Sequence, residues 1–97
     1  MSKKIDTNLL LDAALELSEI HGYRQVTRDQ IAALARVSTG AVTNGLGTMD
    51  QMRKTVVRHA VRTGRDRIIA QAITLGDPYV NRKLNPEDRI RVLQSVL

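Results

Sequence analysis

A short stretch in the middle of the chain carries small polar side chains that could hydrogen-bond to the edges of DNA bases. The polar side chains of this stretch are Ser38, Thr39, Thr43 and Asn44. An Asn amide can donate to and accept from an adenine edge, whereas a Thr offers a hydroxyl to phosphate and a methyl to thymine. Gly40 and Ala41 are small enough to let a helix backbone sit deep in the major groove. Side chains of these types can make contacts with a DNA duplex.

Positive charge is concentrated around this stretch. Residues 23–65 hold eight basic and two acidic residues, a net charge of +6, whereas the rest of the chain holds seven basic and eight acidic residues. The eight basic residues are Arg24, Arg28, Arg36, Arg53, Lys54, Arg58, Arg62 and Arg65. Positive charge gathered in one segment is typical of proteins that bind polyanions. A solvated basic face remains the alternative interpretation.

Residues for other chemistries are missing or isolated. The chain has no Cys, which excludes disulfides and thiolate metal sites. His21 and His59 have no second ligand at metal spacing, so we expect structural roles for both. Asp12 and Glu16 lie one helical turn apart, on a polar face where solvation is the expected role. We therefore expect a protein that is not an enzyme and that holds no metal or cofactor.

The elements that would position the polar stretch are all helical. Apolar residues recur with the 3.6-residue period, and no strand pattern is present, so the predicted fold class is all-α. The expected helices are residues 9–20, 27–35, 39–46, 48–73 with a kink or break near 63–64, and a last helix that begins at 85–86. Residues 76–78 (Gly-Asp-Pro) are interpreted as a stop.

Local signals mark the ends of these helices. Thr27 with Gln30 predicts a capping box, as does Thr48 with Gln51. Ser38 is a suitable cap for the third helix. The expected stops are Gly22 for the first helix and Gly45 with Gly47 for the third. Inward-facing positions of the third helix are expected at Val42 and Leu46. Two short helices joined by a few residues, with longer helices around them, predict a helix-turn-helix.

The residue pattern within residues 9–61 resembles the N-terminal DNA-binding domain of TetR-family regulators. The matching positions are residues 10–17 (LLDAALEL), Gly22, Tyr23, Thr27, Ile31, Ala32, Ala35, Val37, Ser38 and Gly40. The resemblance implies that Thr27 and Arg28 contact backbone phosphate and that the third helix reads bases. It also implies that Tyr23 is a core residue.

Four departures from the family pattern change the expected contacts. Thr43 stands where the family commonly has Tyr, Arg36 replaces a frequent turn Gly, Met49 replaces a phosphate-binding Lys, and residues 45–46 (Gly-Leu) replace His-Phe. The third helix therefore has no charged residue. We expect phosphate affinity to shift to Arg28, Arg36, Arg53 and Lys54. With these, the expected DNA-binding residues are Thr27, Ser38, Thr39, Gly40, Ala41, Thr43 and Asn44.

The chain divides into an expected DNA-binding region, residues 1–64, and a C-terminal helical region, residues 65–97. The second region is too short to enclose the roughly 300 Å³ or more that small-molecule pockets need, so we expect no small-molecule effector. Its apolar residues include Ile68, Ile69, Ala72, Ile73, Leu75, Ile90, Leu93, Val96 and Leu97. We expect them to form a homodimer interface. The alternative is a helical hairpin that closes over the first and fourth helices.

The sequence as a whole predicts a DNA-binding transcriptional repressor. A two-fold dimer would bind an inverted repeat whose half-sites lie about 34 Å apart or a multiple of that distance. The alternatives are a protein-interaction module such as an antirepressor, and an architectural DNA binder without sequence preference. The chain has no signal-peptide core and no membrane-length apolar run, which predicts a cytoplasmic location. Its small size suggests a plasmid or phage origin.

Overall fold

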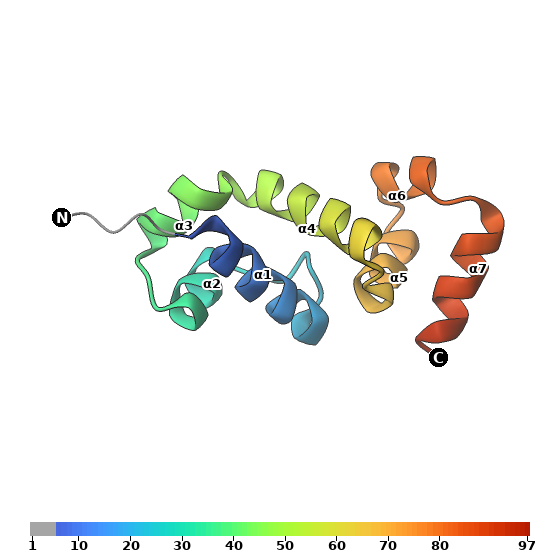
Figure 1. Cartoon of the computed structure of the whole chain (residues 1–97), viewed down its shortest axis with the longest axis horizontal. Helices are drawn as coiled ribbons and strands as arrows, with labels where there is room; N and C mark the ends of the chain where they lie inside the picture. The colour runs from blue at the N-terminus through green and yellow to red at the C-terminus, as the bar shows by residue number, and fades with distance from the viewer. Residues whose placement is uncertain (1–5) are drawn as a thin grey trace.

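A computed structural model describes residues 6–97 of the chain; residues 1–5, the start of the expected region 1–64, lie outside the described residues. Within that range the protein is all-α, as predicted. The helices are α1 (Thr7–His21), α2 (Arg28–Ala35), α3 (Thr39–Leu46), α4 (Met49–Thr63), α5 (Asp66–Thr74), α6 (Pro78–Lys83) and α7 (Pro86–Ser95). The molecule is elongated, measuring 50 × 22 × 19 Å, with α3 toward one end of the long axis and α7 at the other (Figure 1).

The helix ends follow the predicted local signals closely. Both capping boxes are present: Gln30 N donates to Thr27 Oγ1 at 3.2 Å, and Gln51 N donates to Thr48 Oγ1 at 3.1 Å. Gly22 ends α1 with a φ of 89°. Each capping box supplies a hydrogen-bond acceptor to a backbone amide that has no partner within the helix, and Gly22 adopts a positive φ that ends the helix. These predictions are confirmed.

The predicted bounds of α3, residues 39–46, and its stop at Gly47 are confirmed, whereas Gly45 is not a stop. The helix runs through Gly45 to Leu46, and Gly47 caps it by donating its N–H to Thr43 O at 2.8 Å. Gly45 instead serves close packing, because a Cβ there would overlap Cδ1 of Leu10 on α1. Leu10 is fully buried, so it has little room to move. The absent side chain lets α3 lie close to α1.

The chain after α4 differs from the prediction in one respect. The expected break near 63–64 is confirmed, since α4 ends at Thr63 and Gly64 has a left-handed φ of 74°. Residues 76–78, however, do more than stop α5. Asp77 Oδ1 accepts from Tyr79 N at 2.9 Å and caps α6, which was not predicted. The Asp-Pro pair is a start signal as well as a stop.

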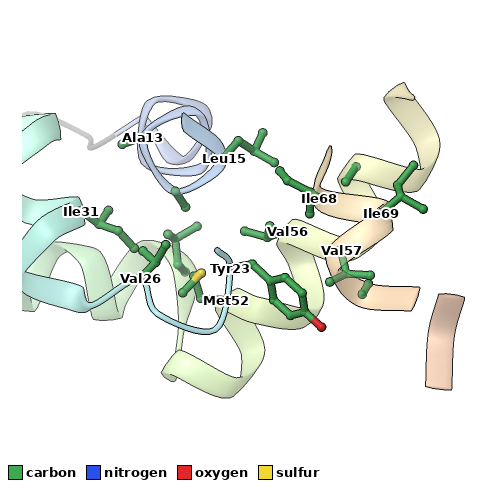
Figure 2. Packing of buried hydrophobic residues seen from close by; sticks show 14 of the residues in the cluster. Ala13, Leu15, Tyr23, Val26, Ile31, Met52, Val56, Val57, Ile68 and Ile69 are labelled. Atoms are coloured by element: carbon green, nitrogen blue, oxygen red, sulfur yellow. The ribbon is translucent and has the colours of Figure 1, made fainter. Parts of the chain in front are cut away.

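One hydrophobic core runs from α1 to α7. Figure 2 shows the part of it formed by α1, α2, α4 and α5. The largest fully buried members of the core are Tyr23, Leu10, Leu15, Ile31, Met52 and Ile68. The burial of Tyr23, and that of Val42 and Leu46 on the inner side of α3, confirms the predicted core positions. The cluster includes residues on both sides of Gly64, so the two expected regions of the chain share one core.

The C-terminal apolar residues divide into two groups. Ile68, Ile69 and Ala72 are buried in the core of the chain. The prediction that these three residues belong to a dimer interface is therefore wrong. In α7 the buried residue is Val92, whereas Ile90 and Leu93 are 56% and 37% exposed. Ile90 and Leu93, two members of the expected dimer interface, therefore face outward. The contact of α7 with α5 decides which side is buried.

None of the helices within residues 6–97 is both long enough and apolar enough to cross a membrane.

Candidate nucleic-acid interface

Helices α2 and α3 form two short helices joined by a tight turn. Arg36 ends α2 in the left-handed conformation, with φ 59° and ψ 47°, and it is the sole non-glycine residue with positive φ within residues 6–97. Val37 N donates back to Ala32 O at 3.0 Å, which closes the turn. Ser38 Oγ then accepts from Ala41 N at 3.1 Å and starts α3. The turn redirects the chain within three residues.

The two sides of α3 differ sharply in burial. Val42 and Leu46 pack into the core, and α3 contacts α1, α2 and α4. The exposed residues of its outer side and cap are Ser38, Thr39, Gly40, Thr43 and Asn44. The polar residues that the sequence singled out are therefore brought together on one accessible surface. Burial on the opposite side is what holds this polar surface outward.

Ala41 does not belong to that surface. It is 7% exposed and lies on the inner side of α3 with Val42. Its small size serves packing between helices, so we remove Ala41 from the expected contact residues. A helix places residues two apart on different sides, and Thr39 and Thr43 accordingly stay exposed while Ala41 is buried.

Several hydroxyl groups at the interface already have one hydrogen bond. Thr27 Oγ1 and Ser38 Oγ accept from backbone amides as caps, which leaves the proton of each hydroxyl available as a donor. Thr43 Oγ1 instead donates to Thr39 O at 3.3 Å. Thr27 and Ser38 therefore suit contact with phosphate oxygens, while Thr43 offers its methyl group and an acceptor.

The four basic residues expected to contact phosphate lie in two separate places. Arg28 and Arg36 belong to α2 and its cap, close in sequence to the turn. Lys54 pairs with Asp50 at 3.4 Å on the exposed side of α4. Arg53 extends toward the α1–α2 loop, where an Nη atom donates to Arg24 O at 3.4 Å. The structure therefore joins Arg53 to Arg24, a basic residue of the charged segment that was not among the expected DNA-binding residues.

The remaining basic residues of α4 are partly engaged with aromatic and polar neighbours. The Arg58 guanidinium lies 5.6 Å from the centroid of the Tyr79 ring, and the Lys83 ammonium lies 5.8 Å from the same centroid. Arg62 Nη2 lies 3.4 Å from His59 Nδ1. Tyr79 thus has cations of α4 and α6 around it. The sequence offered no signal for this, because α6 was not predicted.

An open apolar groove lies at the opposite end from α3, between the α1–α2 loop, α5 and α7. Its volume is about 790 Å³, and its apolar lining includes Ala70, Leu75, Leu93, Val96 and Leu97. Leu75 and Val96 are 47% and 41% exposed. The groove is a surface depression, and the chain does not enclose it. We call this feature the C-terminal groove.

Within residues 6–97 no group of three or more His, Asp or Glu side chains is arranged to hold a metal ion. Comparison of the chain with protein-family models, with curated proteins and with solved structures finds no match. The resemblance to TetR-family regulators therefore stays a prediction from the residues quoted for it.

Proposed function

We propose that this protein is a sequence-specific DNA-binding transcriptional regulator, a repressor that inserts α3 into the major groove of an inverted-repeat operator. One observation carries the proposal. The inner side of α3 is buried in the core, while Thr39, Thr43 and Asn44 are exposed together on its outer side. A helix with this division of burial, joined by a short turn to a second helix, has the form that helix-turn-helix proteins use to reach base edges.

The roles of the individual residues follow from their chemistry. Asn44 is the base-reading residue, since its amide can pair bidentately with an adenine edge. Thr27, Ser38, Arg28 and Arg36 contact backbone phosphates, which set the position of α3 without reading sequence. The absence of charge on α3 makes the phosphate contacts of its neighbours the main source of affinity.

Substitutions can separate reading from phosphate contact. We expect Asn44→Ala to lower the preference for the operator over random DNA by about 10- to 100-fold. We expect Arg28→Ala to weaken binding to every duplex alike and to reduce the log–log salt slope by about 0.9. Asn81→Ala and Arg82→Ala are matched controls on α6, where both residues are exposed. Fluorescence anisotropy with an operator obtained by in vitro selection and with random duplexes measures these effects.

Three outcomes would count against these assignments. Unchanged discrimination in Asn44→Ala would remove Asn44 as the reading residue. Equal affinity of the unsubstituted protein for every duplex would favour an architectural DNA binder. No measurable binding to any duplex at low salt would reject DNA binding itself.

The proposed active form is a homodimer assembled through the C-terminal groove. A single helix-turn-helix reads few base pairs, and a two-fold dimer doubles the site. Leu75, Leu93 and Val96 supply exposed apolar surface for this contact. Helices α3 and α7 lie toward opposite ends of a molecule 50 Å long (Figure 1). In a dimer joined near α7, the angle between the long axes of the two protomers therefore sets the distance between the two α3 helices, and with it the half-site spacing.

Sedimentation tests the dimer. We expect a species of twice the 10.8 kDa chain mass at micromolar concentration, and Leu93→Glu should convert it to monomer. Ile20→Glu is the matched control, because Ile20 is 66% exposed on α1 and does not line the groove. A monomer at every concentration would refute the homodimer.

A second candidate function is supported by the same groove. An apolar depression on a protein whose third helix is uncharged also suits an antirepressor, which binds another regulator and not DNA. Loss of the protein's ability to relieve repression in Leu93→Glu, with no DNA binding by the unsubstituted protein, would favour this candidate.

A further inference from the structure

A second depression, which we call the basic pocket, lies where the α1–α2 loop, α4 and the start of α6 meet. Its volume is about 520 Å³. The side chains that define its chemistry are Tyr23, Arg24, Asp50, Arg53, Lys54 and Asp77. These residues come from three separate parts of the chain, so the pocket exists because of the tertiary fold.

The Tyr23 hydroxyl lies at the basic pocket, near the Arg24 and Asp77 side chains. Tyr23 is 2% exposed, and its backbone N–H donates to Gln71 Oε1 at 3.0 Å, which fixes the residue in place. Its hydroxyl oxygen is buried and makes no close hydrogen bond within residues 6–97, although the Arg24 and Asp77 side chains lie near it. Figure 2 shows the ring beside Val56 and Val57, with the oxygen on the side away from the rest of the cluster. Buried polar atoms without partners are rare in native proteins, so this one calls for an acceptor.

Arg53 supplies a second unsatisfied donor in the same pocket. Its Nε is buried without a partner, while an Nη atom is held by Arg24 O. Neither Arg24 nor Arg53 pairs with a carboxylate in the part of the chain from residue 6 to residue 97. Both guanidinium groups therefore retain donors for a ligand.

One oxygen of each of the two carboxylates in the pocket is already engaged. Asp50 pairs with Lys54 at 3.4 Å. Asp77 Oδ1 accepts from the backbone amides of Tyr79 and Val80, at 2.9 and 3.4 Å. The unused hydrogen-bonding capacity of the pocket is thus mainly donor capacity, which an anionic acceptor would satisfy.

The Tyr23 hydroxyl is a proton donor at neutral pH. Burial raises the pKa of Tyr23 above 10.0, and nearby Asp77 raises it further, whereas Arg24 lowers it. A hydroxyl that keeps its proton, near the Arg24 guanidinium, can donate to an oxyanion.

We propose that the basic pocket binds a phosphate group through the Tyr23 hydroxyl, the Arg53 guanidinium and Arg24. Donors from the α1–α2 loop and from α4 line one pocket, and guanidinium groups bind phosphate by paired hydrogen bonds. The group belongs either to a free phosphate-bearing molecule or to a DNA backbone. The site does not depend on the proposed function, because a free phosphate would bind whether or not α3 reads DNA.

Titration with inorganic phosphate at constant ionic strength tests the site. We expect a saturable shift of the Arg53 Nε–H signal in ¹H–¹⁵N spectra and a rise in the thermal midpoint with phosphate concentration. Tyr23→Phe removes only the hydroxyl and should weaken phosphate binding about tenfold, as the loss of one hydrogen bond to a charged group does. Tyr79→Phe is the matched control, because Tyr79 lies on α6 and does not line the pocket.

Arg53→Lys provides a second variant that retains the positive charge. It removes the Nε donor and should also weaken phosphate binding. A protein without saturable phosphate binding, or a Tyr23→Phe variant that binds phosphate as tightly as the unsubstituted protein does, would overturn the proposal.

A DNA-binding measurement on the same variants identifies the source of the phosphate. Weaker binding to all duplexes in Tyr23→Phe, with phosphate competing against DNA, assigns the pocket to the DNA backbone. Phosphate binding that leaves DNA affinity unchanged assigns it to a free phosphate-bearing molecule. Phosphate binding in a protein that binds no duplex would support the basic pocket and reject the proposed function, so the two proposals fail separately.

Discussion

Arg36 is the position where stability and the proposed DNA contact oppose each other. It holds a left-handed φ of 59° at the end of α2, a conformation that costs a non-glycine residue about 1–2 kcal/mol. The hydrogen bonds of this turn come from the backbone of Arg36 and Val37, so they do not need the Arg36 side chain. The strain is retained at a position where a glycine would relieve it.

Arg36→Gly should therefore stabilise the fold. Glycine removes the left-handed penalty, but it also makes the unfolded chain more flexible, which offsets about 0.5–1 kcal/mol of the gain. The net increase in the free energy of unfolding is about 0.5–1 kcal/mol. For a domain of this size that corresponds to a rise in the thermal midpoint of about 4 °C. Calorimetry or circular dichroism melts measure it.

The same substitution should weaken DNA binding. Loss of one phosphate contact reduces the log–log salt slope by about 0.9, which at about 0.1 M salt corresponds to roughly eightfold lower affinity. Arg36→Ala is the matched control, since it removes the charge and leaves a side chain in the strained conformation. It should lose the same affinity without gaining stability.

The two readouts refute different parts of the reasoning. If Arg36→Gly melts no higher than Arg36→Ala, the left-handed strain is not relieved and the stability argument fails. If neither variant changes affinity or salt slope, Arg36 does not contact phosphate.

Three further predictions concern packing, titration and capping. Gly45→Ala should destabilise the protein by about 1–3 kcal/mol in denaturant titrations, because the new Cβ would overlap buried Leu10. Gly40→Ala has room for its Cβ and should stabilise α3 by about 1 kcal/mol. If both substitutions changed the free energy of unfolding equally, the close packing of Gly45 against Leu10 would be contradicted. Since burial raises the folded-state pKa of Tyr23, its stabilising contribution is present below pH about 10 and declines as pH rises through the folded pKa. Tyr23→Phe should remove that alkaline decline, and an identical decline in melting profiles of both proteins would contradict the prediction. Thr48→Ala should lower the free energy of unfolding by about 1 kcal/mol, since Gln51 N loses its acceptor, and an unchanged thermal midpoint would show that this cap is dispensable.

Much of the local structure could be predicted from neighbouring residues. The capping boxes at Thr27 and Thr48 and the stop at Gly22 depend on hydrogen bonds or conformations that involve residues a few positions apart. The polar outer side of α3 followed from the same short-range periodicity. Such features need no knowledge of the rest of the fold, because the interacting groups are already close in the chain.

Features that join distant parts of the chain could not be predicted in the same way. Gly45 was interpreted as a helix stop because its contact with Leu10, on another helix, is invisible in the local sequence. The choice of Val92 over Ile90 as the buried residue of α7 depends on how that helix packs on α5.

The basic pocket illustrates the same division. The sequence by itself determined the helices and the polar surface of α3, since helix formation and capping depend on groups within about one turn of each other. Only the tertiary structure brought the Tyr23 hydroxyl, Arg53 and Asp77 to one place. Packing between helices determines which distant residues become neighbours. The hydrophobic effect that drives this packing is not directional, so the arrangement depends on all the inter-helix contacts together and not on the local sequence.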